Sequence, residues 1–344
     1  MMNNDNLNVN PAASDASKFR VIGNDAISSE KIIAPRYSYW RSVFRVFFKH
    51  KGNIFLIAMF VIMVLSAVVV PLICVYDSAE NVTKAASFNM SPAKALESYS
   101  NPTIIKDDKE IESPLYHNGS AFKWLLGTGG SGNSIMYNIF AGARTSLFLA
   151  ITCALVNMTL GILIGAVWGF SKRLDAILIP VYNIIANVPY ILLVAVLVYI
   201  IGAGFWQMVF AMTVTQWIGV AFFFRTQVMI IRDREYSLAS KCLGTPVGRI
   251  VSKNILPFLT SVIVTLLATE VPAYISLDTY MSFIGLGMAA SIPSLGHMIS
   301  DAQTAFMTYP WEFWPPVIYA SLLTIILYLL GQSLADATDP KTHM

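Results

Sequence analysis

The stretch IFLIAMFVIMVLSAVVVPLICV, residues Ile54 to Val75, is 22 residues long and contains no charged side chain. An α-helix rises about 1.5 Å per residue, so a helix of this length can cross a hydrocarbon core about 30 Å thick. The whole chain is 56% hydrophobic and 12% charged, with a mean hydropathy of +0.60. Soluble domains carry about 25% charged residues. The sequence therefore predicts an integral membrane protein whose first span occupies 53–76.

Further apolar stretches of spanning length follow the first. They lie at 145–170, at two positions within the uncharged 176–224 on either side of Gly202-Ala203-Gly204, at 258–284 and at 313–335. Together they predict an all-α, polytopic membrane protein with six transmembrane helices, five of them in a core at 145–335.

The segments between the spans differ in charge, and this difference predicts their orientation. Lys or Arg precedes the first span, follows the second at Lys172-Arg173 and is frequent in the loop 225–257, whereas the connections 202–204 and 285–312 contain neither. Positively charged loops stay on the cytoplasmic side. The loop 225–257 and both termini are therefore predicted to be cytoplasmic, and 77–144 is predicted to be external.

The two ends of the chain are polar. Residues 1–36 are rich in Asn, Ser and Asp and predict a disordered cytoplasmic tail, and 336–344 form a short cytoplasmic C-terminus. A helix over 37–52 would be amphipathic, which predicts an interfacial helix at the membrane surface. A basic flank without a helix is the alternative, and it predicts the same orientation. Four aromatic residues share one face of this helix and three cations share another: Trp40, Phe44, Phe47 and Phe48 against Arg41, Arg45 and Lys49.

Composition argues against several other classes. The net charge of +3 is small, and the cations lie between apolar stretches, so no nucleic-acid partner is expected. The three cysteines, Cys74, Cys153 and Cys242, lie far apart and form no Cys/His cluster. Neither a disulfide framework nor a metal site is predicted.

The loop 225–257 is too long for a simple turn and has its own pattern. It contains EYSLASKCLG at 235–244, then Thr245-Pro246, and it ends at Leu256-Pro257. Glycine is common just after the end of a helix and proline in the first turn of a helix, so Gly244 and Pro246 predict two short helices joined by a tight turn. The result would be a rigid projection from the membrane.

This loop resembles the EAA loop of ABC importer permeases, in which Glu-Ala-Ala is followed by three residues, Gly, and a Leu-Pro twelve residues on. Ala239, Gly244, Leu256 and Pro257 match in register. The first motif position is Leu238 instead of Glu, and the third is Ser240 instead of Ala. Peptide permeases often carry an additional Glu-Tyr just upstream, matched here by Glu235-Tyr236.

Nearly the whole chain after residue 37 is similar to the OppC/DppC type of permease, most of all to the Opp/Ami oligopeptide branch of Gram-positive bacteria. The matching phrases are dispersed and occur in the same order: SYWRSV at 38–43, LGT at 126–128, GAR at 142–144, SFIGLG at 282–287, PSLG at 293–296 and LADATDP at 334–340.

The resemblance implies a type I ABC importer permease fold in the plasma membrane and a role as half of a peptide pathway. It implies as partners a homologous OppB-type permease, two cytoplasmic ATPases, an extracellular lipid-anchored peptide-binding protein, the peptide substrate and membrane lipid. ATP and magnesium would be bound by the ATPases, with no cofactor in this chain. The residues implied in ATPase coupling are Glu235, Tyr236, Ala239, Ser240, Gly244, Thr245, Pro246, Leu256 and Pro257. Dipeptides, nickel or another small solute remain alternative cargoes.

Three polar residues lie within the predicted spans. Asn187 belongs to the third span, and Glu270 and Asp278 lie two helical turns apart in the fifth. Polar side chains at this depth usually face protein or a watery path. The two carboxylates therefore line the peptide route or pair with a partner permease, and Asn187 lines the route or packs against protein.

Two other patterns suggest chemistry that the surroundings do not favour. GTGGSGNS at 127–134 differs by one residue from a phosphate-binding loop, but Asn133 replaces the lysine and no strand precedes it, so a structural turn is predicted. Ser294 and His297 would be a nucleophile and base without an apparent third group. A membrane-embedded hydrolase is therefore disfavoured. An ion-coupled secondary transporter would need two matching broken helices, and only the region of Pro272 suggests one.

Overall fold

The computed structural model describes residues 39–74, 89–106, 109–116, 120–130, 132–289 and 291–338. The tail 1–36, the start of the external segment, Asn118-Gly119 and the end of the C-terminal tail lie outside these ranges, so their predictions stay predictions. The chain divides into two compact units, 1–42 and 43–344. Of the first unit, the structure describes 39–42, which begin helix α1 (Tyr39–Lys49).

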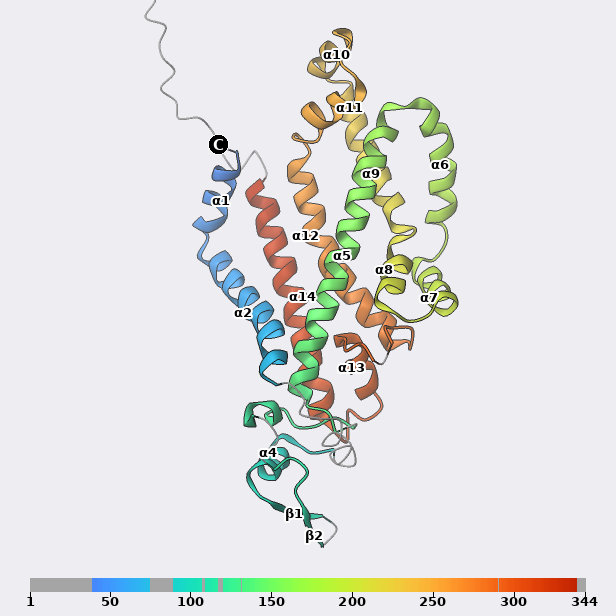
Figure 1. Ribbon diagram of the computed structural model, residues 1–344. Coiled ribbons are helices and arrows are strands. Elements are labelled where there is room, and N and C mark those ends of the chain that lie inside the picture. The colour runs from blue at the N-terminus through green and yellow to red at the C-terminus, as the bar shows by residue number, and fades with distance from the viewer. Residues whose placement is uncertain are drawn as a thin grey trace, which may run out of the picture. The chain divides into compact units, whose positions relative to one another are not determined.

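The second unit is built almost entirely from helices (Figure 1). Four helices are each long and apolar enough to cross a membrane: α2 (Lys51–Ile73), α5 (Ile135–Phe170), α12 (Thr260–Phe283) and α14 (Pro310–Thr338). Two bent pairs add two more spans if each pair counts as one: α6 (Lys172–Ala186) with α7 (Tyr190–Ile201), and α8 (Phe205–Thr213) with α9 (Gln216–Arg232). The predicted all-α membrane fold is confirmed.

The third predicted span differs most from a simple helix. Helices α6 and α7 meet at an angle of 84° across Asn187, Val188 and Pro189. Proline has no N–H to donate and disfavours the helical conformation in the preceding residue, so the helix ends here. Helix α12, in contrast, continues through Pro272. The break that a secondary transporter would need at Pro272 is absent, and the breaks that do occur lie elsewhere.

Helix α5 begins ten residues before the predicted boundary at 145, so 135–144 are the first turns of this helix. The Ser134 hydroxyl caps the helix by accepting a hydrogen bond from the Tyr137 N–H. Gly142 then allows close packing, because a Cβ placed there would lie 2.9 Å from the backbone of Ser294. This stretch carries Arg144, which is why its hydropathy did not mark it as part of a span.

A small substructure precedes α5. It contains α4 (Pro92–Ser100), an antiparallel hairpin of β1 (Thr103–Lys106) and β2 (Lys109–Glu112), and the short 3₁₀ helix η2 (Ala121–Trp124). Its core is formed by Met90, Ala95, Leu115 and Trp124. The hairpin is the one element pair of the described chain that departs from the all-α prediction.

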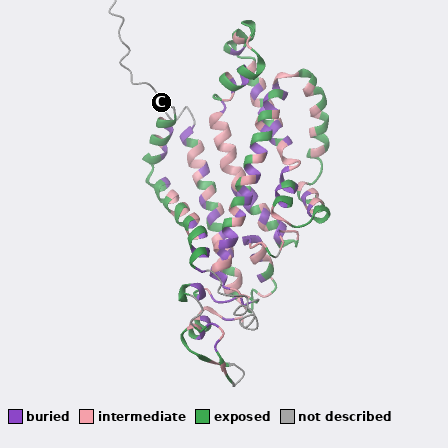
Figure 2. Cartoon of the chain, in the orientation of Figure 1, coloured by how far each residue is buried: buried purple, intermediate pink, exposed green. Residues whose placement is uncertain are grey.

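Helix α5 packs most extensively against α9, through three glycines spaced four residues apart. A Cβ added to Gly161, Gly165 or Gly169 would lie within 2.7 Å of an atom of α9. Small residues at this spacing let two membrane helices approach closely. In Figure 2 the buried residues run along the inner helices, while α6 is exposed or half-buried and has no buried residue.

Candidate functional site

The 225–257 loop begins within α9 and continues through three short elements. These are α10 (Glu235–Cys242), α11 (Val247–Ile250) and the π-helical turn η3 (Val251–Ile255). Two short helices joined by a turn are what the sequence predicts, and the structure has them. The π turn was not predicted. It leads to Pro257, which has no N–H for a helical hydrogen bond.

The turn between α10 and α11 is a Schellman motif. The Gly244 N–H donates to the Lys241 carbonyl at 3.0 Å, and the Thr245 N–H donates to the Ser240 carbonyl at 3.1 Å. Gly244 has a φ of +75°, which L-residues rarely adopt. Pro246 follows as the N-cap of α11. The sequence therefore identified both residues that close the turn.

A further hydrogen bond joins the two halves of the loop. The Asn254 Nδ2 donates to the Ser240 Oγ at 3.0 Å, and the Ser240 Oγ donates to the Tyr236 carbonyl at 2.9 Å. Ser240 occupies the position where the EAA pattern has its second alanine. The substitution therefore supplies a cross-link that an alanine lacks.

The base of the loop is packed into the helical core. Ile250, Ile255 and Leu259 are at most 2% exposed, and they join Phe224 and Val228 of α9 in one apolar cluster. The Leu259 N–H also donates to the Ile255 carbonyl at 3.1 Å. A displacement of α11 and η3 would therefore be transmitted to α9 and α12.

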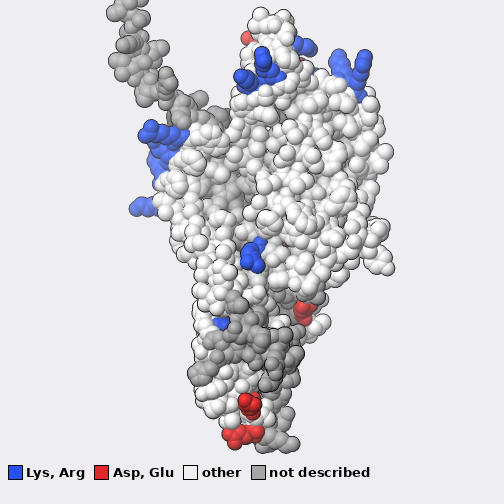
Figure 3. Space-filling model, viewed as in Figure 1, with Lys and Arg blue, Asp and Glu red and all other residues white. Residues whose placement is uncertain are grey.

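The tip of the loop is exposed and apolar. We define the loop tip as Tyr236, Leu238, Leu243 and Val247; Leu243 is 85% exposed and the other three are each 45% exposed. On the face shown in Figure 3, Lys and Arg side chains gather over the end of the unit that carries α10, and carboxylates gather at the other end. Exposed apolar side chains grouped on one short loop make it a candidate interaction site. Glu235, Ala239 and Pro257 are also exposed, whereas Leu256 and Thr245 are half-buried.

Asp278 lies inside this chain. Its side chain is 0% exposed, and its Oδ2 accepts a hydrogen bond of 2.7 Å from the Ser146 hydroxyl of α5. The same hydroxyl accepts a bond of 3.3 Å from the Leu295 N–H of α13 (Leu295–Ala302). The sequence predicts Asp278 on the peptide route or at a subunit interface, and that role stays a prediction; in the described chain the carboxylate is enclosed between helices of the same chain. The carboxylate ties α5, α12 and α13 together.

Glu270 belongs to a different polar group, two turns away on α12. The Asn157 amide of α5 donates a hydrogen bond to the Tyr274 hydroxyl, which lies one helical turn after Glu270 on α12. Glu270 is half-buried, while Asn157 is fully buried. Glu270 is thus the carboxylate of the two that retains an accessible side.

Asn187 caps the end of α6 at the 84° bend. Its Nδ2 donates to the Asn183 carbonyl at 2.6 Å, and its side chain is exposed. The structure brings none of Asn187, Glu270 and Asp278 together with the loop tip.

Two suggestive motifs have structural roles. In the 127–134 turn, Gly127 has a φ of +85°, and the Thr128 hydroxyl accepts a hydrogen bond of 2.8 Å from the Met90 N–H. The Ser294 hydroxyl caps α13 by accepting from the His297 N–H at 3.1 Å. The His297 imidazole points to Asp301 at 3.3 Å, a partner that the sequence analysis missed. Ser294 therefore acts as a helix cap.

Comparison with known proteins settles the family. Residues 157–344 match the family described as the inner membrane component of binding-protein-dependent transport systems. The chain belongs to this permease family. Residues 38–92 also match the N-terminal transmembrane domain of oligopeptide transport permease C. The chain is therefore a membrane component of an ABC importer and not an enzyme.

Two of three individual relatives match along almost the full length of the chain. The chain is 39% identical over 329 residues to the oligopeptide transport system permease AmiD of Streptococcus pneumoniae, covering 96% of this chain and 98% of that protein. It is 29% identical over 324 residues to OppC of Bacillus subtilis, covering 94% and 96%. It is 35% identical over 224 residues to the dipeptide permease DppC of Bacillus subtilis, covering 64% and 70%.

Proposed function

We propose that this permease carries oligopeptides into the cell, as one of two homologous permease subunits that together form the pathway. The similarity to an oligopeptide permease over 96% of the chain is the observation that supports this cargo. Dipeptide permeases match at lower identity over that length: DppC of Lactococcus lactis is 29% identical over 94% of the chain, against 39% for AmiD. Nickel and other small solutes have no support among the relatives described above.

The orientation follows from the distribution of charge. Lys172, Arg232, Arg234, Lys241, Arg249 and Lys253 all lie on α6 or on the elements from α9 to η3. Short loops rich in Lys and Arg stay in the cytoplasm. The α10 end is therefore cytoplasmic, and so are both termini. The substructure of α4 and the hairpin lies outside, where a lipid-anchored peptide-binding protein would deliver its cargo.

In this proposal the energy for transport comes from two cytoplasmic ATPase subunits that bind ATP and magnesium. This chain itself binds no nucleotide. The loop tip docks onto an ATPase, with Leu243 as the most exposed apolar residue. Closure of the ATPases moves α10 and α11. The buried side chains of Ile250, Ile255 and Leu259 pass this movement to α9 and α12, which opens the peptide path alternately to each side.

The experiment that tests this function combines copurification with transport. The chain is purified in mild detergent, and the proteins that accompany it are identified. Uptake of labelled oligopeptides is then compared in cells with and without the chain. We expect a second permease and ATPases in the complex, and uptake that requires the chain. Uptake driven by an ion gradient without any ATPase would contradict the proposal.

A further inference from the structure

A pocket beside the α10 end has no role in the proposed mechanism. It measures about 540 Å³ and lies where α5 ends, α6 begins and α9 ends. This volume lies within the range of about 300–1,000 Å³ that is typical of sites for small ligands. Its lining is Trp168, Gly169, Ser171, Lys172, Asp175, Ala176, Ile179, Pro180, Met229 and Arg232.

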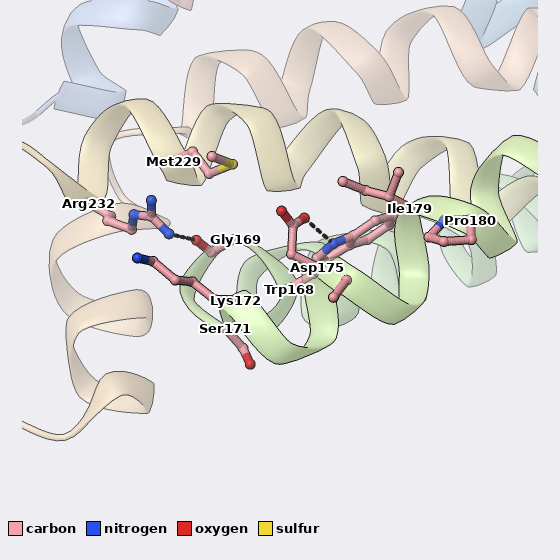
Figure 4. A pocket seen from close by; sticks show the side chains of 10 residues that line it. Trp168, Gly169, Ser171, Lys172, Asp175, Ile179, Pro180, Met229 and Arg232 are labelled. Atoms are coloured by element: carbon pink, nitrogen blue, oxygen red, sulfur yellow. Dashed lines mark hydrogen bonds between the residues drawn. The ribbon is translucent and has the colours of Figure 1, made fainter.

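The pocket has a cationic end and an apolar end (Figure 4). Lys172 from α6 and Arg232 from α9 lie together at one end, while Ile179 and Pro180 lie at the other. Met229 and the Trp168 ring lie between them. Lys172 and Arg232 stand at the ends of apolar helices that can span a bilayer. Residues at such helix ends lie at the depth of the lipid headgroups.

The one carboxylate in the pocket is already neutralised. Arg225 holds Asp175 in a two-pronged ion pair, with Nη2 to Oδ2 at 2.8 Å, and the Trp168 indole donates to Oδ1 at 2.8 Å. Arg225 also lies over the Trp168 ring, 5.7 Å from its centroid. Asp175 therefore does not cancel the charge of the two cations that line the pocket.

Both cations have hydrogen-bond donors without a partner among the described residues. The Lys172 ammonium makes no ion pair or hydrogen bond with another described residue. Arg232 donates from Nη1 to the Gly169 carbonyl at 2.6 Å and from Nε to the exposed Asp233 at 3.1 Å, which leaves Nη2 without a partner among the described residues. Both groups are donors suited to a phosphate oxygen.

We propose that this pocket binds the phosphate-bearing headgroup of an anionic phospholipid, with an acyl chain along Ile179 and Pro180. The neighbouring face of α6 supports a lipid as the source of the phosphate, because Ile177 and Ile184 are 63% and 69% exposed and α6 buries no residue. A free phosphate would gain nothing from the apolar end. The bound lipid fills the space between α6 and α9 and holds α6, which has no buried residue, against the core.

The test measures lipid retained by the complete transporter complex, purified from a mixture of phosphatidylglycerol and phosphatidylcholine. Washing at about 1 M salt, where the Debye length is about 3 Å, removes lipid that is attracted only by diffuse charge. We expect phosphatidylglycerol to be retained selectively. The variant Lys172→Gln should retain at least about tenfold less, the fold-change for losing one hydrogen bond to a charged group.

Arg173→Gln is the matched control, because Arg173 is the next residue, is exposed and does not line the pocket. It should retain as much phosphatidylglycerol as the unmodified complex.

Ile179→Ser should weaken retention of the lipid without changing any competition by inorganic phosphate. Equal loss in Lys172→Gln and Arg173→Gln, no selective retention, or displacement of the lipid by inorganic phosphate alone would overturn the proposal. If an ATPase covers the pocket in the complex, no phosphatidylglycerol will be retained, and this result also overturns the proposal.

Discussion

Gly244 closes the turn between α10 and α11 with a φ of +75° and has open space around it, since no atom lies within 4 Å of a Cβ built there. Gly244→Ala should therefore strain the turn without a clash, at a cost of about 1–2 kcal/mol. Uptake of labelled peptide should fall about tenfold if this cost opposes docking directly, while the amount of protein in the membrane stays the same.

Gly248 provides the control for that substitution. It also has nothing within 4 Å, but it lies in α11 and its φ is not positive. Gly248→Ala should leave uptake unchanged. Normal uptake by Gly244→Ala would remove the turn from the coupling mechanism.

The buried Asp278 allows a second test at the residue scale. Asp278→Ala removes the acceptor of the Ser146 hydroxyl and should lower the free energy of unfolding by about 1–3 kcal/mol. Asp278→Asn keeps an acceptor oxygen and should be milder. Thermal unfolding of the purified complex, at one heating rate, measures both. If Asp278→Asn abolished uptake at unchanged stability, the carboxylate would belong to the peptide route after all.

The residues that the sequence predicted correctly are those whose role is local. Gly244 and Pro246 were identifiable because turn geometry depends on a few neighbouring residues. The partner of Asp278 within the chain could not be predicted, because Ser146 is 132 residues away in the sequence. Ser240 was predicted as a coupling-loop residue that departs from the motif, but its bond to Asn254 could not be predicted because the two residues meet only when the loop folds.

At the scale of the elements, the α5–α9 contact depends on close backbone approach. A Cβ at Gly165 would lie 2.4 Å from the Ala221 carbonyl oxygen of α9. Gly165→Ala should therefore force the helices apart and cost about 1–3 kcal/mol. The thermal midpoint of the complex measures the loss. Gly219→Ala, on α9 but with nothing within 4 Å, is the control and should not lower the midpoint; equal midpoints for the two variants would contradict close packing.

The number and type of the spanning elements could be predicted because apolar length is a property of the sequence itself. The spacing of Gly161, Gly165 and Gly169 was also present in the sequence and was overlooked. The 84° bend could be predicted from a nearby residue, Pro189. No nearby residue predicts the early start of α5. That start depends on Gly142 meeting Ser294, a contact between distant parts of the chain.

At the scale of the whole molecule, the chain exposes an apolar tip at its most cationic end and is one component of a larger importer. Leu243→Glu should place a charge in the docking interface, where unpaired buried charge is costly. We expect the ATPases to be lost from the copurified complex, while the second permease remains. Retention of the ATPases at the unmodified level would show that the tip is not the docking surface.

The native Cys242 offers the most direct test of the central claim, that the loop tip lies in the cytoplasm against an ATPase. It is exposed and adjacent to Leu243, whereas Cys74 and Cys153 are buried. The measurement is labelling of Cys242 by a membrane-impermeant maleimide, with Leu125→Cys in a Cys242→Ser background as the control from the other end of the unit. Cys242 should react only in inside-out vesicles and only after the ATPases are stripped, and the control only in right-side-out cells. Labelling of Cys242 from outside, or equal labelling with and without the ATPases, would contradict the account.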